Sequence, residues 1–487
     1  MKRSILTLAI AGAGLSACSL APKYVQPELP VPPSWPVGDA YLKRSEAALP
    51  SVSYRDIFRD ARLQRIVEQA LVNNRDLRVA AANIAAARAQ YRIQRAELLP
   101  QVDATANVTR SDAGTGRTNN GGATVTGGAR TSYTADIGIT AFEIDLFGRI
   151  RSLSTAAQNR YFATEAAARA TRLTLVGDIA TAWATYGADK SLLKIAQDTV
   201  ASAGSSVKLT KARLDGGVAP RTDLAQAQLV LAQAQSDLAE QTTALAQDIN
   251  ALQLLVGAPV DAALLPADIE DAGRNLSELP AGLDSGILLR RPDVLQAEYE
   301  LRATNAEIGA ARAALFPRIS LTAVLGLASN ALSGLFTGGA FNYSVAPSAS
   351  YSIFQAGAAR ANVRLSEAQR DAALATYEKS IQTAFQEVSD ALARRGTITD
   401  QTRAAQSLAA AATDNYRLSD ARYRGGIDTF LQSLDAQRSL YSARRSLVAT
   451  QLTAASNLVT LYRVLGGDAL LEATPAGPVP VNATPKP

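Results

Sequence analysis

The sequence contains no histidine, one cysteine and one methionine among its 487 residues. Without histidine there can be no Ser-His or Cys-His nucleophile pair, no histidine general base and no His-ligated zinc site. Chemistry based on carboxylates or lysine stays possible, but no cluster of carboxylates stands out along the chain. The composition therefore favours a protein that is not an enzyme and that uses no cofactor.

Long apolar runs are also scarce. Beyond the first residues, no segment approaches the roughly 18–20 apolar residues that a membrane-spanning helix needs. If the chain crosses a membrane, it must therefore do so with β-strands. The net charge of +5 is spread along the chain instead of forming a Lys/Arg block beside aromatic residues. This distribution indicates solvated helix faces and no nucleic-acid partner.

The single cysteine ends a stretch with the pattern of an export signal. Residues 1–17 have a basic start, an apolar core from Ile5 to Leu15, and Leu-Ser-Ala directly before Cys18. This pattern resembles a bacterial lipobox, in which the chain is cut before the cysteine and Cys18 is acylated. Ser19, in the place of an aspartate, favours sorting to the outer membrane. The alternative is an ordinary signal peptide followed by an incidental cysteine.

The second half of the chain repeats the first. Residues 76–102 and 293–319 align at one constant offset without a gap, including the first aspartate and the proline near the end of each segment. Residues 212–218 match 421–427 at a second constant offset, through a shared Gly-Gly pair. A duplicated unit of roughly 200 residues is too long for a solenoid and predicts one architecture built from two equivalent halves.

In each half a helical pattern stops at a proline, and an alternation of period two follows. The second alternating segment, for example, places Tyr133, Ala135, Ile137, Ile139 and Ala141 on one apolar face. Strands of about 10 residues with one apolar and one polar face are typical of transmembrane β-strands between lipid and a wet lumen. The alternative is a pair of half-buried hairpins in a soluble sheet. The strands are predicted near residues 101–111, 131–143, 318–328 and 342–354.

Four strands cannot close a barrel, because bacterial outer-membrane barrels begin at about eight. Two copies of the chain would supply eight strands and a lumen filled by side chains, whereas three would supply twelve and leave a channel. Small Ser, Thr and Gly residues on the polar faces favour the open lumen. The pattern therefore predicts a homotrimer.

The helices suggest matched columns. The stretch from Arg149 to Leu214 has no proline and, as a helix of about 66 residues, would be roughly 100 Å long. The stretch from Gly357 to Arg424 is equivalent. Each ends in a Gly-Gly turn and returns through a shorter helix, while further helices precede the strands near Ala61–Leu98 and Pro292–Leu315. Stacked end to end, a returning helix and a strand-preceding helix together match one long helix. Each half therefore predicts two parallel helical columns, each chain four, and a trimer a tube of twelve.

Taken together, these features resemble the TolC-like outer membrane efflux proteins. Within that family they are most similar to the NodT-type outer membrane factor lipoproteins of resistance-nodulation-division (RND) efflux systems. The resemblance covers residues 18–470 and includes Leu-Phe-Gly-Arg at 146–149, Leu-Phe-Pro-Arg-Ile at 315–319, Tyr-Arg-Gly-Gly at 423–426 and Leu-Asp-Ala-Gln at 434–437.

The fold implied by the resemblance is mainly α with a membrane β-barrel. Three chains would form a 12-stranded barrel, four strands per chain, continuous with a 12-column α-helical periplasmic tunnel. An equatorial belt would come from residues 36–60, 258–282 and the tail. The implied domains are a signal peptide at 1–17, an extended lead at 18–60, a first repeat at 61–257, an equatorial insertion at 258–282, a second repeat at 283–466 and a C-terminal tail at 467–487.

The resemblance also implies two sites at the periplasmic end. A pore constriction would be formed by Leu431 and Asp435, and gate-holding polar contacts by Asp223, Tyr423 and Asp428. Related channels often carry a second acid at the position of Leu431 or Gln432, which this chain lacks. The helix turns would dock an adaptor through Arg213, Leu214, Gly216, Gly217, Val218, Arg422, Arg424, Gly425, Gly426 and Ile427.

The implied function is a passive exit duct of a tripartite RND-type efflux pump, lipid-anchored at Cys18 in the outer membrane and extending into the periplasm. It would export small toxic compounds or drugs. Its partners would be two further copies of itself, a periplasmic adaptor (membrane fusion protein), an inner-membrane RND transporter and outer membrane lipid. The alternatives are an exit duct for type I protein secretion and a lipid-anchored periplasmic scaffold without a pore. The alternating strands disfavour the scaffold.

Overall fold

The computed structural model describes residues 19–38, 40–41, 53–112, 129–274, 276 and 285–481. The expected signal peptide and Cys18 lie outside these residues, as do parts of the expected lead, equatorial insertion and tail. The chain divides into two compact units. Unit 1 comprises residues 1–26, 85–161 and 299–375, and unit 2 comprises residues 27–84, 162–298 and 376–487. Among the described helices, none combines the length and the apolar character needed to cross a lipid bilayer.

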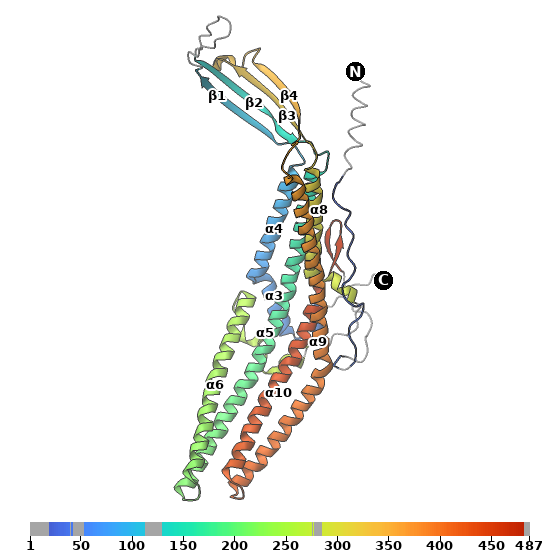
Figure 1. Cartoon of the computed structure of the whole chain (residues 1–487). Coiled ribbons are helices and arrows are strands. Elements are labelled where there is room, and N and C mark those ends of the chain that lie inside the picture. Colours follow the sequence, from blue (N-terminus) through green and yellow to red (C-terminus); the bar gives the residue numbers. More distant parts are fainter. Residues whose placement is uncertain are drawn as a thin grey trace. The chain divides into compact units, whose positions relative to one another are not determined.

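Unit 1 contains a four-stranded antiparallel sheet in the order β1-β2-β3-β4 (Figure 1). Its two outer strands, β1 and β4, each leave one edge unpaired by any described strand. The register places one apolar residue from each strand in a row across one face, and acidic, amide and glycine positions in rows across the other. The strands are β1 (Val102–Ser111), β2 (Arg130–Glu143), β3 (Arg318–Ser329) and β4 (Phe341–Ser350).

Two strand details differ from the sequence expectation. A register shift between Ile139 and Phe142 interrupts the alternation, and Ala141 has a left-handed φ of 53°. The expected continuation of the apolar face through Ala141 is therefore broken by a β-bulge, which moves one residue out of the ladder. The fourth strand was expected to reach residue 354 but ends at Ser350.

The helices of the two halves have matching lengths. α4 (Arg75–Ala96) and α8 (Pro292–Ala313) have 22 residues each. α5 (Arg149–Asp215) and α9 (Ala358–Arg424) have 67 residues each. The returning helices, α6 (Arg221–Val256) and α10 (Phe430–Val464), have 36 and 35 residues.

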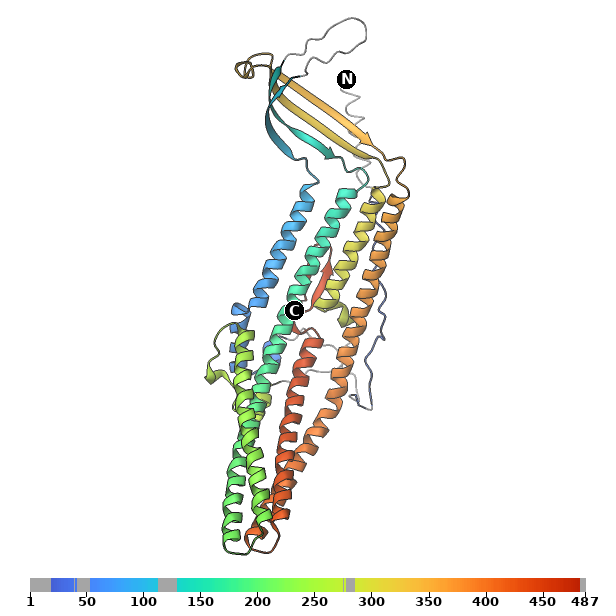
Figure 2. The ribbon, with the colours of Figure 1, turned by 60° about the vertical axis from the view of Figure 1, so that its left-hand side comes forward.

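In unit 2, α5 lies beside α6, and α9 lies beside α10 (Figures 1 and 2). Each pair forms an antiparallel helical hairpin. Along α9, residues spaced alternately four and three apart are buried, namely Tyr377, Ile381, Ala384, Val388 and Ala391. This burial follows from the spacing of three and four residues, which keeps one face of a helix against its neighbours.

The single helix expected from Ala61 to Leu98 is two helices, α3 (Ala61–Asn73) and α4, separated at Asn74. Asn74 has an extended ψ of 137°, and its Oδ1 accepts a hydrogen bond of 3.0 Å from the Leu77 amide, as an N-cap does. Its Nδ2 donates to the Leu255 carbonyl at 2.7 Å, at the end of α6. The break therefore joins α3 and α4 to the returning helix.

The expected tail contains a hairpin that the sequence did not indicate. β5 and β6 pair in antiparallel fashion, and Gly477 lies so close to the Phe162 ring that a Cβ atom would be 2.7 Å from it. Arg172 forms a two-pronged ion pair with Asp468 just before this hairpin. The shorter elements are α2 (Tyr54–Ile57), η1 (Ala262–Leu264), α7 (Ile269–Arg274), η2 (Ser285–Arg290), η3 (Leu332–Gly334), η4 (Gly467–Ala469), β5 (Leu471–Thr474) and β6 (Gly477–Pro480).

Candidate functional site

The turns that end α5 and α9, here called the tip turns, have the same hydrogen-bond pattern. In the first, the amides of Val218 and Gly217 donate to the carbonyls of Arg213 and Leu214, both at 2.9 Å. The corresponding amides of Ile427 and Gly426 donate to Arg422 and Tyr423 at 2.9 and 3.0 Å. This is the Schellman arrangement, which requires a left-handed residue after the helix. Gly217 and Gly426 supply it with φ values of 74° and 76°.

Tyr423 lies at the tip end of the contact between the two hairpins, which we call the hairpin seam. Its side chain is buried with Ala227, Phe430 and Leu434. Arg213 Nη1 donates a 2.8 Å hydrogen bond to the Tyr423 carbonyl, and the guanidinium lies 4.7 Å from the ring centre. A cation over a tyrosine face is attracted by the ring quadrupole. Tyr423 thus joins α9 to α5.

The two acids among the expected gate contacts, Asp428 and Asp223, have no hydrogen bond to the other hairpin within the described residues. Asp428 pairs with Arg422 of its own tip turn, with Nη2 and Oδ1 3.0 Å apart. This hydrogen bond and charge hold the pKa of Asp428 below its usual value. Asp223 lies in the first turn of α6 and has no side-chain hydrogen bond within the described residues. Of the three expected gate contacts, the structure brings only Tyr423 into contact with another hairpin.

Leu431 and Asp435 lie on one exposed face of α10, one turn apart. The Leu431 side chain is 62% exposed, whereas Phe430 and Leu434 beside it are buried in the seam. The helix therefore presents its buried face to the other hairpin and directs Leu431 and Asp435 away from it. Nothing within the described chain covers this pair.

The arginines of the tip turns are all engaged. Arg213 contacts Tyr423, Arg422 pairs with Asp428, and Arg424 Nε lies 2.8 Å from Asp420 Oδ2. The large apolar residues of the same turns are free of such contacts, since Val218 is 71% and Ile427 68% exposed. The tip turns therefore offer exposed apolar side chains beside arginines that are held by contacts within the chain.

Further polar contacts along the seam were not anticipated from the sequence. The Tyr416 hydroxyl lies 2.6 Å from Ser202 Oγ, which also accepts a 3.2 Å hydrogen bond from Gln437. The Tyr441 hydroxyl donates to Asp237 at 2.6 Å, and burial together with this bond raises the pKa of Tyr441 to about 12. The sequence feature that could have indicated them is the spacing of Tyr416 and Tyr423 by seven residues, which places both on the same face of α9.

A pair of carboxyls lies between α5 and α6. Burial, followed by the charge of Asp189, raises the pKa of Asp248 to about 7. Burial also raises the pKa of Asp189. Asp248 Oδ2 is buried and no described residue gives it a hydrogen bond. Two carboxyls in such a site repel each other when both are ionised, so the neutral form of Asp248 is favoured.

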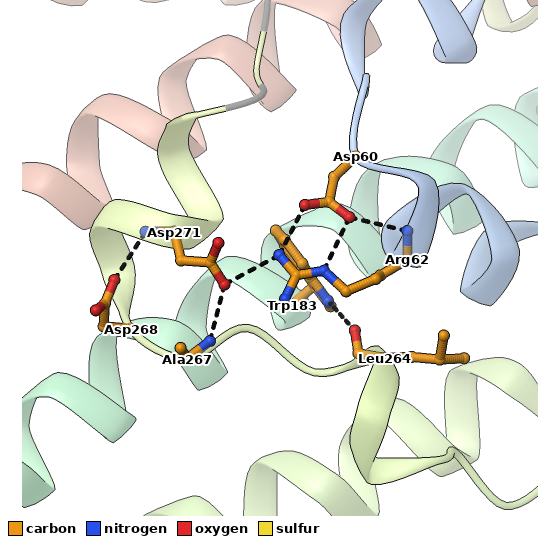
Figure 3. A network of polar contacts seen from close by, with 7 residues as sticks. All are labelled: Asp60, Arg62, Trp183, Leu264, Ala267, Asp268 and Asp271. Carbon is orange, nitrogen blue, oxygen red and sulfur yellow. Dashed lines mark hydrogen bonds and ion pairs between the residues drawn. The ribbon is translucent and has the colours of Figure 1, made fainter.

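A second polar network holds α3, α5 and α7 together in unit 2 (Figure 3). Arg62 binds Asp60 with its Nε and Nη2 and binds Asp271 through Nη2 at 2.9 Å. Its guanidinium lies 5.6 Å from the centre of the Trp183 ring, and Trp183 Nε1 donates to the Leu264 carbonyl at 3.0 Å. The Ala267 amide, then Arg62, lowers the pKa of Asp271. The network fixes the loop between α6 and α7 against α5.

In the described residues, no set of three or more His, Cys, Asp or Glu side chains is placed to hold a metal ion. The geometry instead defines two linked helical hairpins with a duplicated turn, together with a separate antiparallel sheet.

Comparison with known proteins identifies the family. The model of the family described as "Outer membrane efflux protein" matches residues 66–258 and 284–467. The chain belongs to this family. It is 42% identical over 469 residues to the probable efflux pump outer membrane protein TtgC of Pseudomonas putida, covering 96% of each chain.

Two solved structures have a similar fold. A membrane protein from Pseudomonas aeruginosa has a TM-score of 0.84 and 38% identity, covering 92% of this chain and 100% of the other. The open state of the Neisseria gonorrhoeae MtrE outer membrane channel has a TM-score of 0.81 and 34% identity, with coverage of 92% and 98%. The chain is thus a mainly helical, TolC-like outer membrane efflux protein.

Proposed function

We propose that this protein is the exit duct of a tripartite RND-type efflux pump. Three copies close a 12-stranded barrel in the outer membrane, and their helical hairpins form a periplasmic tunnel of twelve columns. An inner-membrane transporter supplies the energy, so the duct itself carries small toxic compounds passively. The duplicated halves each supply two strands and two helical columns.

The observation that carries this proposal is the exposed apolar face of an open four-stranded sheet. Ala104, Ile137, Leu325 and Tyr343 form one cross-strand row, in which Ile137 and Leu325 are 52% and 53% exposed and Tyr343 71%. Exposed apolar faces and unpaired edges are costly in water. Lipid against this face, and neighbouring copies at both edges, would remove both costs.

The polar face suits a wet lumen. Asp136 and Gly326 face each other there, and a Cβ at Gly326 would overlap the Asp136 carboxylate. Thr105 and Asn342 extend the same row to the two outer strands. A row of small and polar residues leaves room for solute, as the lumen of a channel requires.

α4 supports contacts between copies. None of its residues is buried, although it is rich in alanine and carries Val79 and Ile93 at 56% and 61% exposure. A helix with a small-residue face and exposed aliphatic side chains suits close packing against another helix. A neighbouring copy in the trimer would cover it.

The tip turns would dock a periplasmic adaptor, and the α10 face would line the narrow end of the tunnel. Because the arginines are held by contacts within the chain, the exposed Val218 and Ile427 would be the main contacts for the adaptor. Three Asp435 carboxylates around one axis would repel each other and attract cations. Acylation of Cys18 would anchor the chain to the outer membrane.

The test is the behaviour of the purified full-length chain. Sedimentation in detergent should give a trimer, and planar bilayers should show stable conductance steps. Ile137→Lys should prevent insertion, because a charge facing lipid costs about 2–4 kcal/mol at the membrane centre. The matched variant Asn342→Lys, on the polar face, should still insert. A protein that remains monomeric, or inserts equally well with lysine on either face, contradicts the proposal.

A further inference from the structure

Unit 1 contains a cavity at the junction of its strands and helices. It has a volume of about 470 Å³ and is lined by the end of β2, the start of β3, the residues after β4 and the first turn of α9. Phe147 and Phe316, one from each half of the chain, stack beside it with ring centres 4.6 Å apart.

Positive charge exceeds negative charge in this cavity. The Glu143 carboxylate is bound by Arg149, through Nε at 2.7 Å and Nη2 at 2.8 Å, and also lies 3.3 Å from Arg318 Nε. A third lining arginine, Arg360, has no ion pair with any described residue. The other lining acid, Asp145, is occupied by Arg151, whose Nη2 also binds its carbonyl. Of the three lining guanidiniums, two therefore share the Glu143 carboxylate and the third, that of Arg360, has no acidic partner among the described residues.

The rim of the cavity is apolar and exposed. Directly after β4, Tyr351, Ile353 and Phe354 are 60%, 92% and 86% exposed. Tyr351 and Ile353 continue the odd-numbered positions of β4, where Tyr343 and Val345 are also largely exposed. The apolar face of the sheet is therefore continuous with the rim of a basic cavity.

We propose that this cavity binds the phosphate headgroup of an anionic membrane phospholipid, whose acyl chains lie along Ile353 and Phe354. Arginines read phosphate through paired N–H groups, and aromatic residues favour the boundary between headgroups and acyl chains. A lipid supplies the anion and the apolar chain in one molecule. A second copy of this chain would have to supply both separately. The inference rests on the proposed function, because it needs the apolar face of the sheet to lie in a membrane.

The test measures lipid bound to the detergent-purified full chain by native mass spectrometry. The anionic lipid phosphatidylglycerol should bind at one site per chain. The zwitterionic lipid phosphatidylcholine should bind much more weakly. Arg360→Gln should weaken phosphatidylglycerol binding several-fold without disturbing the Glu143 pairs. The double variant R318Q/R360Q should weaken it on the order of tenfold. Arg364→Gln, one turn further along α9 and exposed, is the matched control and should bind like the parent.

Several outcomes would overturn the inference. Equal binding by the parent and Arg360→Gln removes the site, and so does equal binding of the two lipids. Binding of inorganic phosphate without lipid would assign a site for a free anion. Cross-linking of Phe354→Cys between copies in the membrane would show that a neighbouring chain covers the rim.

Conductance of the same sample distinguishes failure of the lipid site from failure of the exit duct. Channels without lipid preference contradict the lipid site alone, whereas a sample without channels contradicts the exit duct and the lipid site with it.

Discussion

Arg213 and Tyr423 join the two helical hairpins by two interactions at once. The guanidinium lies 4.7 Å from the ring centre of Tyr423, and Nη1 donates a 2.8 Å hydrogen bond to the Tyr423 carbonyl. The carbonyl belongs to the second tip turn and also accepts the Gly426 amide at 3.0 Å. One arginine of the first hairpin thereby holds the turn of the second.

Replacing this arginine should loosen the seam. Arg213→Ala removes a cation–π contact and a charged hydrogen bond, which together contribute about 1–3 kcal/mol. We expect a lower free energy of unfolding and a higher conductance in planar bilayers, because the hairpins can separate. Lys211→Ala, whose partner Asp215 is 61% exposed, should change stability by less than about 0.5 kcal/mol. An unchanged conductance for Arg213→Ala would show that the seam does not control opening.

Asp435 provides the test of the constriction. Asp435→Ala should raise the conductance and abolish cation preference, because the ring of carboxylates that attracts cations is lost. Asp414→Ala, an exposed acid of α9 paired with Arg417, should leave both properties as they are. Reversal potentials in a salt gradient measure the preference. If the two variants behave alike, Asp435 does not line the pore.

The carboxyl pair between α5 and α6 predicts a pH-dependent stability. Because the pKa of Asp248 is raised to about 7 in the folded chain, folding favours the protonated form. The stabilisation of the folded state by protonated Asp248 is fully present below the ordinary aspartate pKa of about 4. It is lost as the pH rises through about 7. Asp248→Asn should therefore raise the melting temperature at pH 8 and flatten its dependence on pH between about 4 and 7.

The matched control for this prediction is Glu240→Gln, an exposed acid on the same helix. It should keep the pH dependence of the parent. Melting followed by circular dichroism across this pH range gives the comparison. If the melting temperatures of the parent and of Asp248→Asn change by the same amount between pH 5 and pH 8, the pKa of Asp248 is not raised in the folded chain.

Replacing glycine with alanine should have opposite effects in a tip turn and inside a helix. Gly426→Ala forces a left-handed φ of 76° on a residue with a Cβ, which costs about 1–2 kcal/mol. Gly204 lies inside α5, where an added Cβ would meet no atom within 4 Å. Gly204→Ala should stabilise the helix by about 0.5–1 kcal/mol. Hydrogen exchange should become faster at the tip turn in the first variant and slower in α5 in the second.

Much of the fold could be predicted locally. Alternation of period two located the four strands, and proline-free stretches located α5 and α9, because strand and helix periodicity are written residue by residue. The helix break at Asn74 was missed, since its cap and its bond to Leu255 join residues far apart in the sequence. The hairpin at β5 and β6 was missed for the same reason, as it packs against Phe162.

The features of the candidate site also fall into those that the sequence predicts and those that depend on the tertiary structure. The sequence by itself determined the Gly-Gly turns, the alternating strands and the positions of Leu431 and Asp435 one helical turn apart, because these depend only on backbone preference and spacing. Only the tertiary structure decided that Asp428 pairs within its own turn, that Tyr423 meets Arg213, and that burial beside Asp189 raises the pKa of Asp248. Those partners are far apart along the chain or compete with nearer ones, and burial selects among them.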